Sequence, residues 1–191
     1  MTETAKETLH VALRETRAAM VGKLDGLSEY DVRRPLTPTG TNLLGLVKHL
    51  AGIEYGYFGD SFGCPPVPQL PWVADGSVWD NADMWATPDE TRDDLLDLYR
   101  RAWTHADRTI DEHPLEAPAV VPWWEEDRKA TTLGVLLVRV LVDTARHAGQ
   151  ADIVRELVDG RADSLEQGDA QWWTAHHERV AAAADRFHLP R

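Results

Sequence analysis

Apolar residues recur three and four positions apart in five stretches of the chain, the pattern of helices that bury one face. Together with capping residues at the ends, this pattern predicts helices over residues 3–26, 41–58, 88–113, 131–159 and 169–187. The first four favour a four-helix bundle with a ligand site between helices. The predicted fold class is therefore all-α. We expect one domain over 1–191, with 161–191 as a C-terminal helical extension.

Three sets of signals locate the helix ends. Thr87, Pro88 and Glu90 have the spacing of a capping box, which predicts the start of the third bundle helix. Gly160 is expected to end the fourth helix in a left-handed conformation. Asp169 is expected to cap the C-terminal helix.

The connection over residues 59–86 is long and irregular. Its four prolines, three glycines and three tryptophans exclude a long helix or a central strand. Loops of this length in compact domains are usually functional. Trp72, Trp79 and Trp85 are expected either to wall a pocket or to hold the loop against the bundle.

The fourth predicted helix carries a carboxylate and an imidazole in its apolar stripe. Asp143 and His147 are four residues apart, so their side chains lie one above the other. Burying them costs free energy unless they are paired, hydrogen-bonded or bound to a metal. One interpretation is a pair of metal ligands on one helix. The alternative is a hydrogen bond between them, or an ion pair of Asp143 with Arg139 or Arg146.

Two further polar candidates lie on the second predicted helix. His49 is at the flank of the apolar stripe and Glu54 is near its middle. His49 is either a third ligand or an ordinary boundary residue. Glu54 either serves the site or pairs with an arginine. His10, on the first helix, is off the stripe and is expected to be solvated.

Composition narrows the function class. Asp and Glu number 32 against 20 Lys and Arg, the net charge is −12, and no basic block appears, so no nucleic-acid partner is expected. Cys64 is the one cysteine, which excludes a disulfide within the chain. No apolar run reaches 18 residues and the N-terminus lacks the apolar core of a signal peptide. We therefore expect no membrane partner and a cytoplasmic location.

Several segments resemble the DinB-like superfamily, in the branch of actinobacterial proteins typified by the mini-circle protein. They are the Trp-rich loop and the stretches GTNLLGLVKHLAGIEYGYF, ATPDETRDDLLDLYRRA and TLGVLLVRVLVDTARHAGQADIVRELVDG. The most specific element is K-H-L on the second helix, followed far downstream by A-R-H-A-G-x-A-D-I-x-R-E-L-x-D-G. The resemblance covers most of residues 1–160. It implies a DinB-like four-helix bundle with a long Trp/Pro-rich loop and a C-terminal extra helix.

The resemblance also implies a metal site. DinB-like proteins hold a divalent metal with one histidine of the second helix and two residues four apart on the last bundle helix. The matching positions here are His49, Asp143 and His147. The middle ligand is glutamate in the mycothiol-dependent maleylpyruvate isomerase relatives and histidine in many members, so aspartate departs from both. The branch also often has histidine at the positions of Arg139 and Gln150. Three N and O ligands leave one coordination position open, as in catalytic zinc sites.

The implied cofactor is a divalent metal, with zinc and nickel foremost, and the implied co-substrate is mycothiol. We therefore expect a metal- and thiol-dependent transferase or isomerase that acts on a small molecule. Glu54 is the candidate general base, or a group that orients a ligand. The alternative is a non-catalytic binding or stress-associated protein of the same fold. A homodimer is compatible with either.

Overall fold

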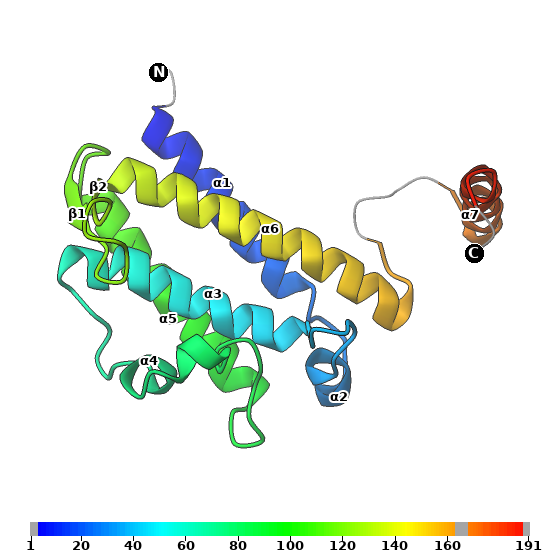
Figure 1. Ribbon diagram of the computed structural model, residues 1–191, viewed down its shortest axis with the longest axis horizontal. Helices are drawn as coiled ribbons and strands as arrows, with labels where there is room; N and C mark the ends of the chain where they lie inside the picture. Colours follow the sequence, from blue (N-terminus) through cyan, green and yellow to red (C-terminus); the bar gives the residue numbers. More distant parts are fainter. Residues whose placement is uncertain (1–3, 163–167, 189–191) are drawn as a thin grey trace. The chain divides into compact units, whose positions relative to one another are not determined.

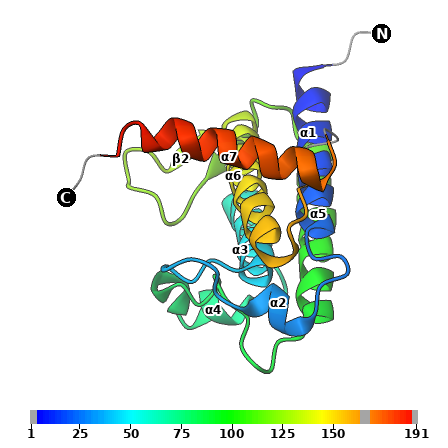
Figure 2. The same cartoon turned by 90° about the vertical axis from the view of Figure 1, so that its right-hand side faces the viewer.

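Four long helices form the first of two compact units, Met1–Arg161, in the computed structural model (Figure 1). The structure describes residues 4–162 and 168–188. The bundle helices are α1 (Ala5–Gly22), α3 (Leu43–Phe58), α5 (Arg92–Glu112) and α6 (Leu133–Asp159). α6 packs against α1 and α3, and α3 packs against α5 (Figure 1; Figure 2). The predicted all-α class and the bundle are confirmed.

Shorter elements connect the bundle helices. They are α2 (Glu29–Arg33), η1 (Asp60–Phe62), α4 (Pro71–Ala74), η2 (Ser77–Asp80), β1 (Pro118–Val120) and β2 (Ala130–Thr132). The second compact unit, Ala162–Arg191, contains α7 (Ala170–Asp185). None of the helices in the described ranges is both long and apolar enough to cross a membrane.

Local capping chemistry explains most helix boundaries. Thr4 and Glu7 form a capping box at the start of α1, and residue 3, the predicted first residue, lies outside the described residues. Asn42 caps α3 by accepting a hydrogen bond from the backbone of Gly45. Gly160 ends α6 with φ of 74°. Asp169 caps α7, as predicted.

The predicted start of the third bundle helix is wrong by four residues. Thr91 caps α5 through the backbone N–H of Asp94. The segment that begins at Thr87 is instead a turn, in which the Glu90 carboxylate accepts from the Thr87 backbone N–H at 2.7 Å. Both threonines precede an acidic residue at the third position, so the chain contains two capping patterns in succession and the helix uses the second.

The connection between α5 and α6 contains a small two-stranded sheet. β1 pairs with β2 in antiparallel register, with Ala119 opposite Thr131. The connection between them carries Trp123 and Trp124, whose rings lie 5.2 and 6.0 Å from the ring of Tyr57 on α3. The strand pair therefore holds two aromatic side chains against the central helix.

Two clusters of buried side chains form the core of the bundle. One includes Leu50 and Tyr99 and the other includes Ile110 and Leu136. Each fully buried aliphatic side chain contributes about 1.5–3 kcal/mol relative to exposure. The apolar stripe that the sequence predicts for the fourth bundle helix is Leu136, Val140, Thr144, Ala151, Val154 and Val158. The first five are buried in α6 and Val158 is half-buried.

Candidate metal centre

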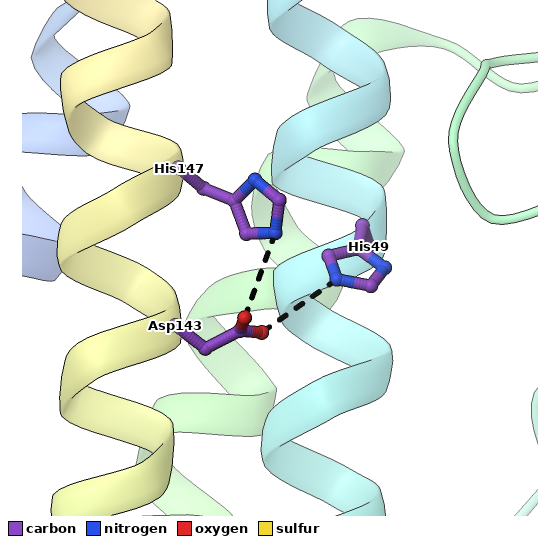
Figure 3. Close-up of side chains that lie close together, drawn as sticks. All are labelled: His49, Asp143 and His147. Atoms are coloured by element: carbon purple, nitrogen blue, oxygen red, sulfur yellow. Dashed lines mark ion pairs between the residues drawn. The ribbon is translucent and has the colours of Figure 1, made fainter.

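The packing of α3 against α6 brings His49, Asp143 and His147 together, although 94 positions separate the first two (Figure 3). One possible ligand atom from each residue lies within 4.8 Å of the others. The Nε2 atom of His49 is 3.7 Å from Asp143 Oδ2, and that of His147 is 3.8 Å from Asp143 Oδ1. Within residues 4–162 and 168–188 this is the one group of three such side chains.

Both imidazoles are oriented by an acceptor on the opposite side of the ring. His49 Nδ1 donates to the carboxylate of Asp83 at 2.6 Å. His147 Nδ1 donates to the side-chain oxygen of Gln150 at 2.7 Å. With Nδ1 carrying a proton, each ring in its neutral form presents the lone pair of Nε2 towards Asp143. Such acceptors beside a histidine are the usual support for metal-ligating imidazoles.

The sequence did not indicate that Asp83 and Gln150 would orient the two imidazoles. Gln150 lies three residues after His147, so helical spacing alone could have identified it. Asp83 comes from the irregular loop, and its residue is 7% exposed. Nothing in the sequence distinguishes it from the loop's other acidic residues, Asp60, Asp75 and Asp80.

Burial and neighbouring charges shift the pKa values of His49, Asp143 and His147. Burial opposes a charge on His49, but the nearby negative charges of Asp143 and Asp83 and the hydrogen bond to Asp83 outweigh it and raise the pKa of His49 to about 9. The imidazole of His49 beside the carboxylate lowers the pKa of Asp143. Burial lowers the pKa of His147. At neutral pH and without a metal, His49 is therefore protonated between two carboxylates, and a metal must displace that proton.

Asp143 and His147 lie at the edge of the buried stripe of α6, not inside it as predicted. Their side chains are 30% and 15% exposed, whereas the neighbouring Thr144 is fully buried. Thr144 lies on the face that packs into the core, and the two candidate ligands are rotated from that face towards α3. Solvent and small molecules can therefore reach the cluster.

Glu54 lies in a different cluster. Its carboxylate is fully buried and accepts two hydrogen bonds from the guanidinium of Arg17, at 2.7 and 2.5 Å. Arg17 also donates to Asp107 at 2.6 Å, and His10 contacts the same carboxylate at 2.8 Å. The structure thus does not place Glu54 with the candidate ligands, and the arginine pairing considered for it is present. His10 is 6% exposed, so its predicted solvation is wrong.

Two cavities meet at His49, and we call them the large cavity and the small cavity. The large cavity has a volume of about 710 Å³ and lies between α3 and the loop over residues 59–86. The small cavity has a volume of about 470 Å³ and lies between α3 and α6. Both include Ile53 and Tyr57 in their walls. Aromatic residues of the large cavity are Tyr55, Tyr57, Trp72, Trp79 and Trp123.

Two glycines of α3 lie against tryptophan side chains that line the large cavity. A Cβ atom on Gly56 would lie 2.9 Å from the ring of Trp123, and one on Gly52 would lie 3.5 Å from Trp72 Nε1. Trp72 is buried, whereas Trp79 is 74% exposed. Both residues wall the cavity, and Trp85 is not among its lining residues.

The fold and the site define the class: a DinB-like helical bundle with a His, Asp, His cluster between two of its helices. The chain belongs to the mycothiol-S-transferase family, whose model matches residues 8–160. A crystal structure described as a conserved protein from Enterococcus faecalis shares the fold, with a TM-score of 0.63 and 15% identity. That match covers 84% of this chain and 100% of the other. No curated protein matches the chain.

Proposed function

We propose that the protein is a metal-dependent enzyme that transfers a group to the sulfur of mycothiol. The observation that carries the proposal is the orientation of His49 and His147, whose Nε2 atoms both face Asp143 while each Nδ1 is tied to a neighbouring acceptor. The match to the mycothiol-S-transferase family supports the identity of the thiol.

The donor set fits a divalent metal. Two imidazole nitrogens and one carboxylate suit zinc, nickel, iron and manganese, and three protein ligands leave a position open. His49, Asp143 and His147 would hold the ion, and Asp83 and Gln150 orient the two imidazoles. When bound, the metal supplies Lewis-acid chemistry that makes a thiol nucleophilic at neutral pH.

We assign the thiol to the large cavity. Its volume is in the ordinary range for small-molecule sites, about 300–1,000 Å³. The wall runs along α3 from His49 to Tyr57, a rise of about 12 Å at 1.5 Å per residue. The sulfur would lie at the His49 end, while the aromatic walls exclude water from the remainder of the molecule. A thiol co-substrate is kept reduced in the cytoplasm, which agrees with the expected location.

Glu54 takes no part in this proposal as a general base. Its two oxygen atoms are committed to Arg17, and the pair joins α3 to α1. We assign it the role of holding together the helices that carry the site.

Elemental analysis of protein purified without chelator tests the metal. We expect about one divalent ion per chain in the wild type, and loss of the ion in His147→Ala and His49→Ala. His177→Ala is the matched control, because this exposed histidine of α7 lies outside the cluster and should leave the metal content unchanged.

Transfer is tested by incubating the metal-loaded protein with mycothiol and an electrophile and detecting the thioether by mass spectrometry. We expect His147→Ala to lower product formation to the uncatalysed level. A wild-type protein free of metal and inactive with every electrophile would favour the non-catalytic alternative.

A further inference from the structure

The small cavity differs from the large one in its charge. Arg139 and Arg146 of α6 lie in its wall together with the candidate ligands His49 and Asp143. Among the residues that the structure describes, neither guanidinium forms an ion pair with a carboxylate. The charge of Arg146 acts on Asp143 in the same wall, but the two groups are too far apart for an ion pair. In a chain of net charge −12, which repels anions overall, two arginines beside the site that form no ion pair with the described carboxylates create a local preference for a negative group.

Arg139 is held in a defined position. Its Nε atom donates to the hydroxyl of Tyr57 at 2.8 Å, and its guanidinium lies over the ring of Trp124 at 4.9 Å. The hydrogen bond uses Nε, so the two terminal NH₂ groups stay available. A guanidinium fixed in this way binds a carboxylate with a smaller loss of side-chain entropy than a mobile one.

The remainder of the small cavity is apolar. Three valines of α6, at positions 135, 138 and 142, line it and are 53%, 46% and 51% exposed, and Ile53 of α3 faces them across the cavity. An aliphatic surface next to two cations matches a ligand with an apolar body and an acidic end.

We propose that the small cavity binds the electrophilic co-substrate, and that this molecule is a carboxylic acid with an apolar body whose carboxylate is bound by Arg139 and Arg146. The inference rests on the proposed function, because it takes the large cavity as the thiol site and His49 as the point where the two molecules meet. For an α,β-unsaturated acid the step is an addition. The sulfur forms a bond to the β-carbon, the π electron pair moves to the α-carbon, and that carbon takes up a proton in place of the one lost by the thiol.

A pair of esters separates recognition of the charge from general reactivity. Monoethyl fumarate carries one carboxylate and diethyl fumarate none, and both accept thiols at the same double bond. With mycothiol and metal-loaded protein, we expect Arg139→Gln and Arg146→Gln each to raise KM for the monoester about tenfold or more, the size of a lost charge-assisted hydrogen bond. KM for the diester should change less than about twofold on the same reasoning.

Arg108→Gln, an exposed arginine of α5 outside both cavities, is the matched control and should leave both esters unaffected. Arg139→Gln also removes the stack on Trp124 and the hydrogen bond to Tyr57. Within residues 4–162 and 168–188, Arg146 stacks on no aromatic ring, so Arg146→Gln removes the charge without this loss of packing. Equal effects on the two esters, or no effect on either, would overturn the proposal.

Binding of succinate provides a readout that needs no turnover. In calorimetric titrations of chelator-treated protein, the wild type and Arg108→Gln should bind succinate at least tenfold more tightly than the two cavity variants. Succinate binding without transfer to any electrophile would reject the proposed function and keep the acid-binding site. Succinate binding that is absent, or unchanged in both cavity variants, would reject the acid-binding site.

Discussion

Helix α3 carries two clusters of ionisable side chains five residues apart, and they differ in how their polar atoms are satisfied. In the Glu54 cluster, the carboxylate is fully buried and both of its oxygens accept hydrogen bonds from Arg17. In the His49 cluster, the side chains are 15–30% exposed, and the two Nε2 atoms lie 3.7 and 3.8 Å from the oxygens of Asp143. Those distances exceed the usual hydrogen-bond length and leave the facing atoms available.

The comparison separates a stabilising network from a binding site more clearly than residue type does. Both clusters combine carboxylates with basic side chains next to apolar residues of α3. The first satisfies its atoms internally, so a ligand would have to break existing bonds. The second fixes the Nδ1 atoms of His49 and His147 through Asp83 and Gln150, and it leaves both Nε2 atoms facing Asp143.

The largest predicted effect concerns the Glu54 cluster. Glu54→Gln leaves the buried guanidinium of Arg17 without its main counter-charge, and we expect the free energy of unfolding to fall by about 3–5 kcal/mol. Denaturant titration measures the change, and elemental analysis should show an unchanged metal content. Lost metal with unchanged stability would mean that the roles assigned to the two clusters are reversed.

The second effect is a pH dependence of the metal-free protein. The pKa of His49 is raised from 6.5 to about 9, so its contribution to stability is complete below pH 6.5 and is lost as pH rises through 9. We expect the chelator-treated wild type to lose about 2–3 kcal/mol across this window relative to His49→Gln. Metal affinity should change in the opposite direction, because ligation requires neutral His49. Parallel pH profiles of the wild type and His49→Gln would contradict the assignment.

The third effect tests how far Asp83 supports the His49 cluster. Asp83→Asn keeps the shape of the side chain but removes the charge that orients and polarises His49. We expect metal affinity to fall about 10- to 100-fold, as is typical for such partners, with a smaller change in apo stability. Competition with a chromogenic chelator gives the affinity. Asp75→Asn, in the same loop but outside the large cavity, should behave as wild type.

The smallest effect concerns the other histidine. Gln150→Ala removes a neutral acceptor from His147, and a neutral hydrogen bond contributes about 0.5–1.5 kcal/mol. The expected loss of metal affinity is therefore about tenfold or less, measured by the same competition. A loss larger than that of Asp83→Asn would show that the orientation of His147, not of His49, dominates the site.

Local chemistry made much of the fold predictable from the sequence. Helix periodicity and the caps at Gly160 and Asp169 depend on neighbouring residues, and both of these ends are found where they were expected. The start of α5 was misplaced because Thr87 and Thr91 carry equivalent signals, and tertiary contacts decide between them.

Contacts between distant segments were not predictable in the same way. The pairing of Glu54 with Arg17 and of His49 with Asp83 joins residues 37 and 34 positions apart, and no periodicity relates them. The three candidate ligands came from a family resemblance together with the four-residue spacing of Asp143 and His147. Their orientation required the structure, because it depends on which atom each neighbouring side chain offers.

The separation of the candidate ligands along the chain has a consequence for the lifetime of the protein. An ion held by His49 and Asp143 would close a loop of 94 residues and act as a reversible cross-link between α3 and α6. An ion that binds the folded state and not the unfolded chain, in which these ligands are far apart, adds stability in proportion to the logarithm of its free concentration. Metal supply would thereby set how often the chain opens to proteases, so scarcity of the ion would lower the amount of the protein as well as its activity.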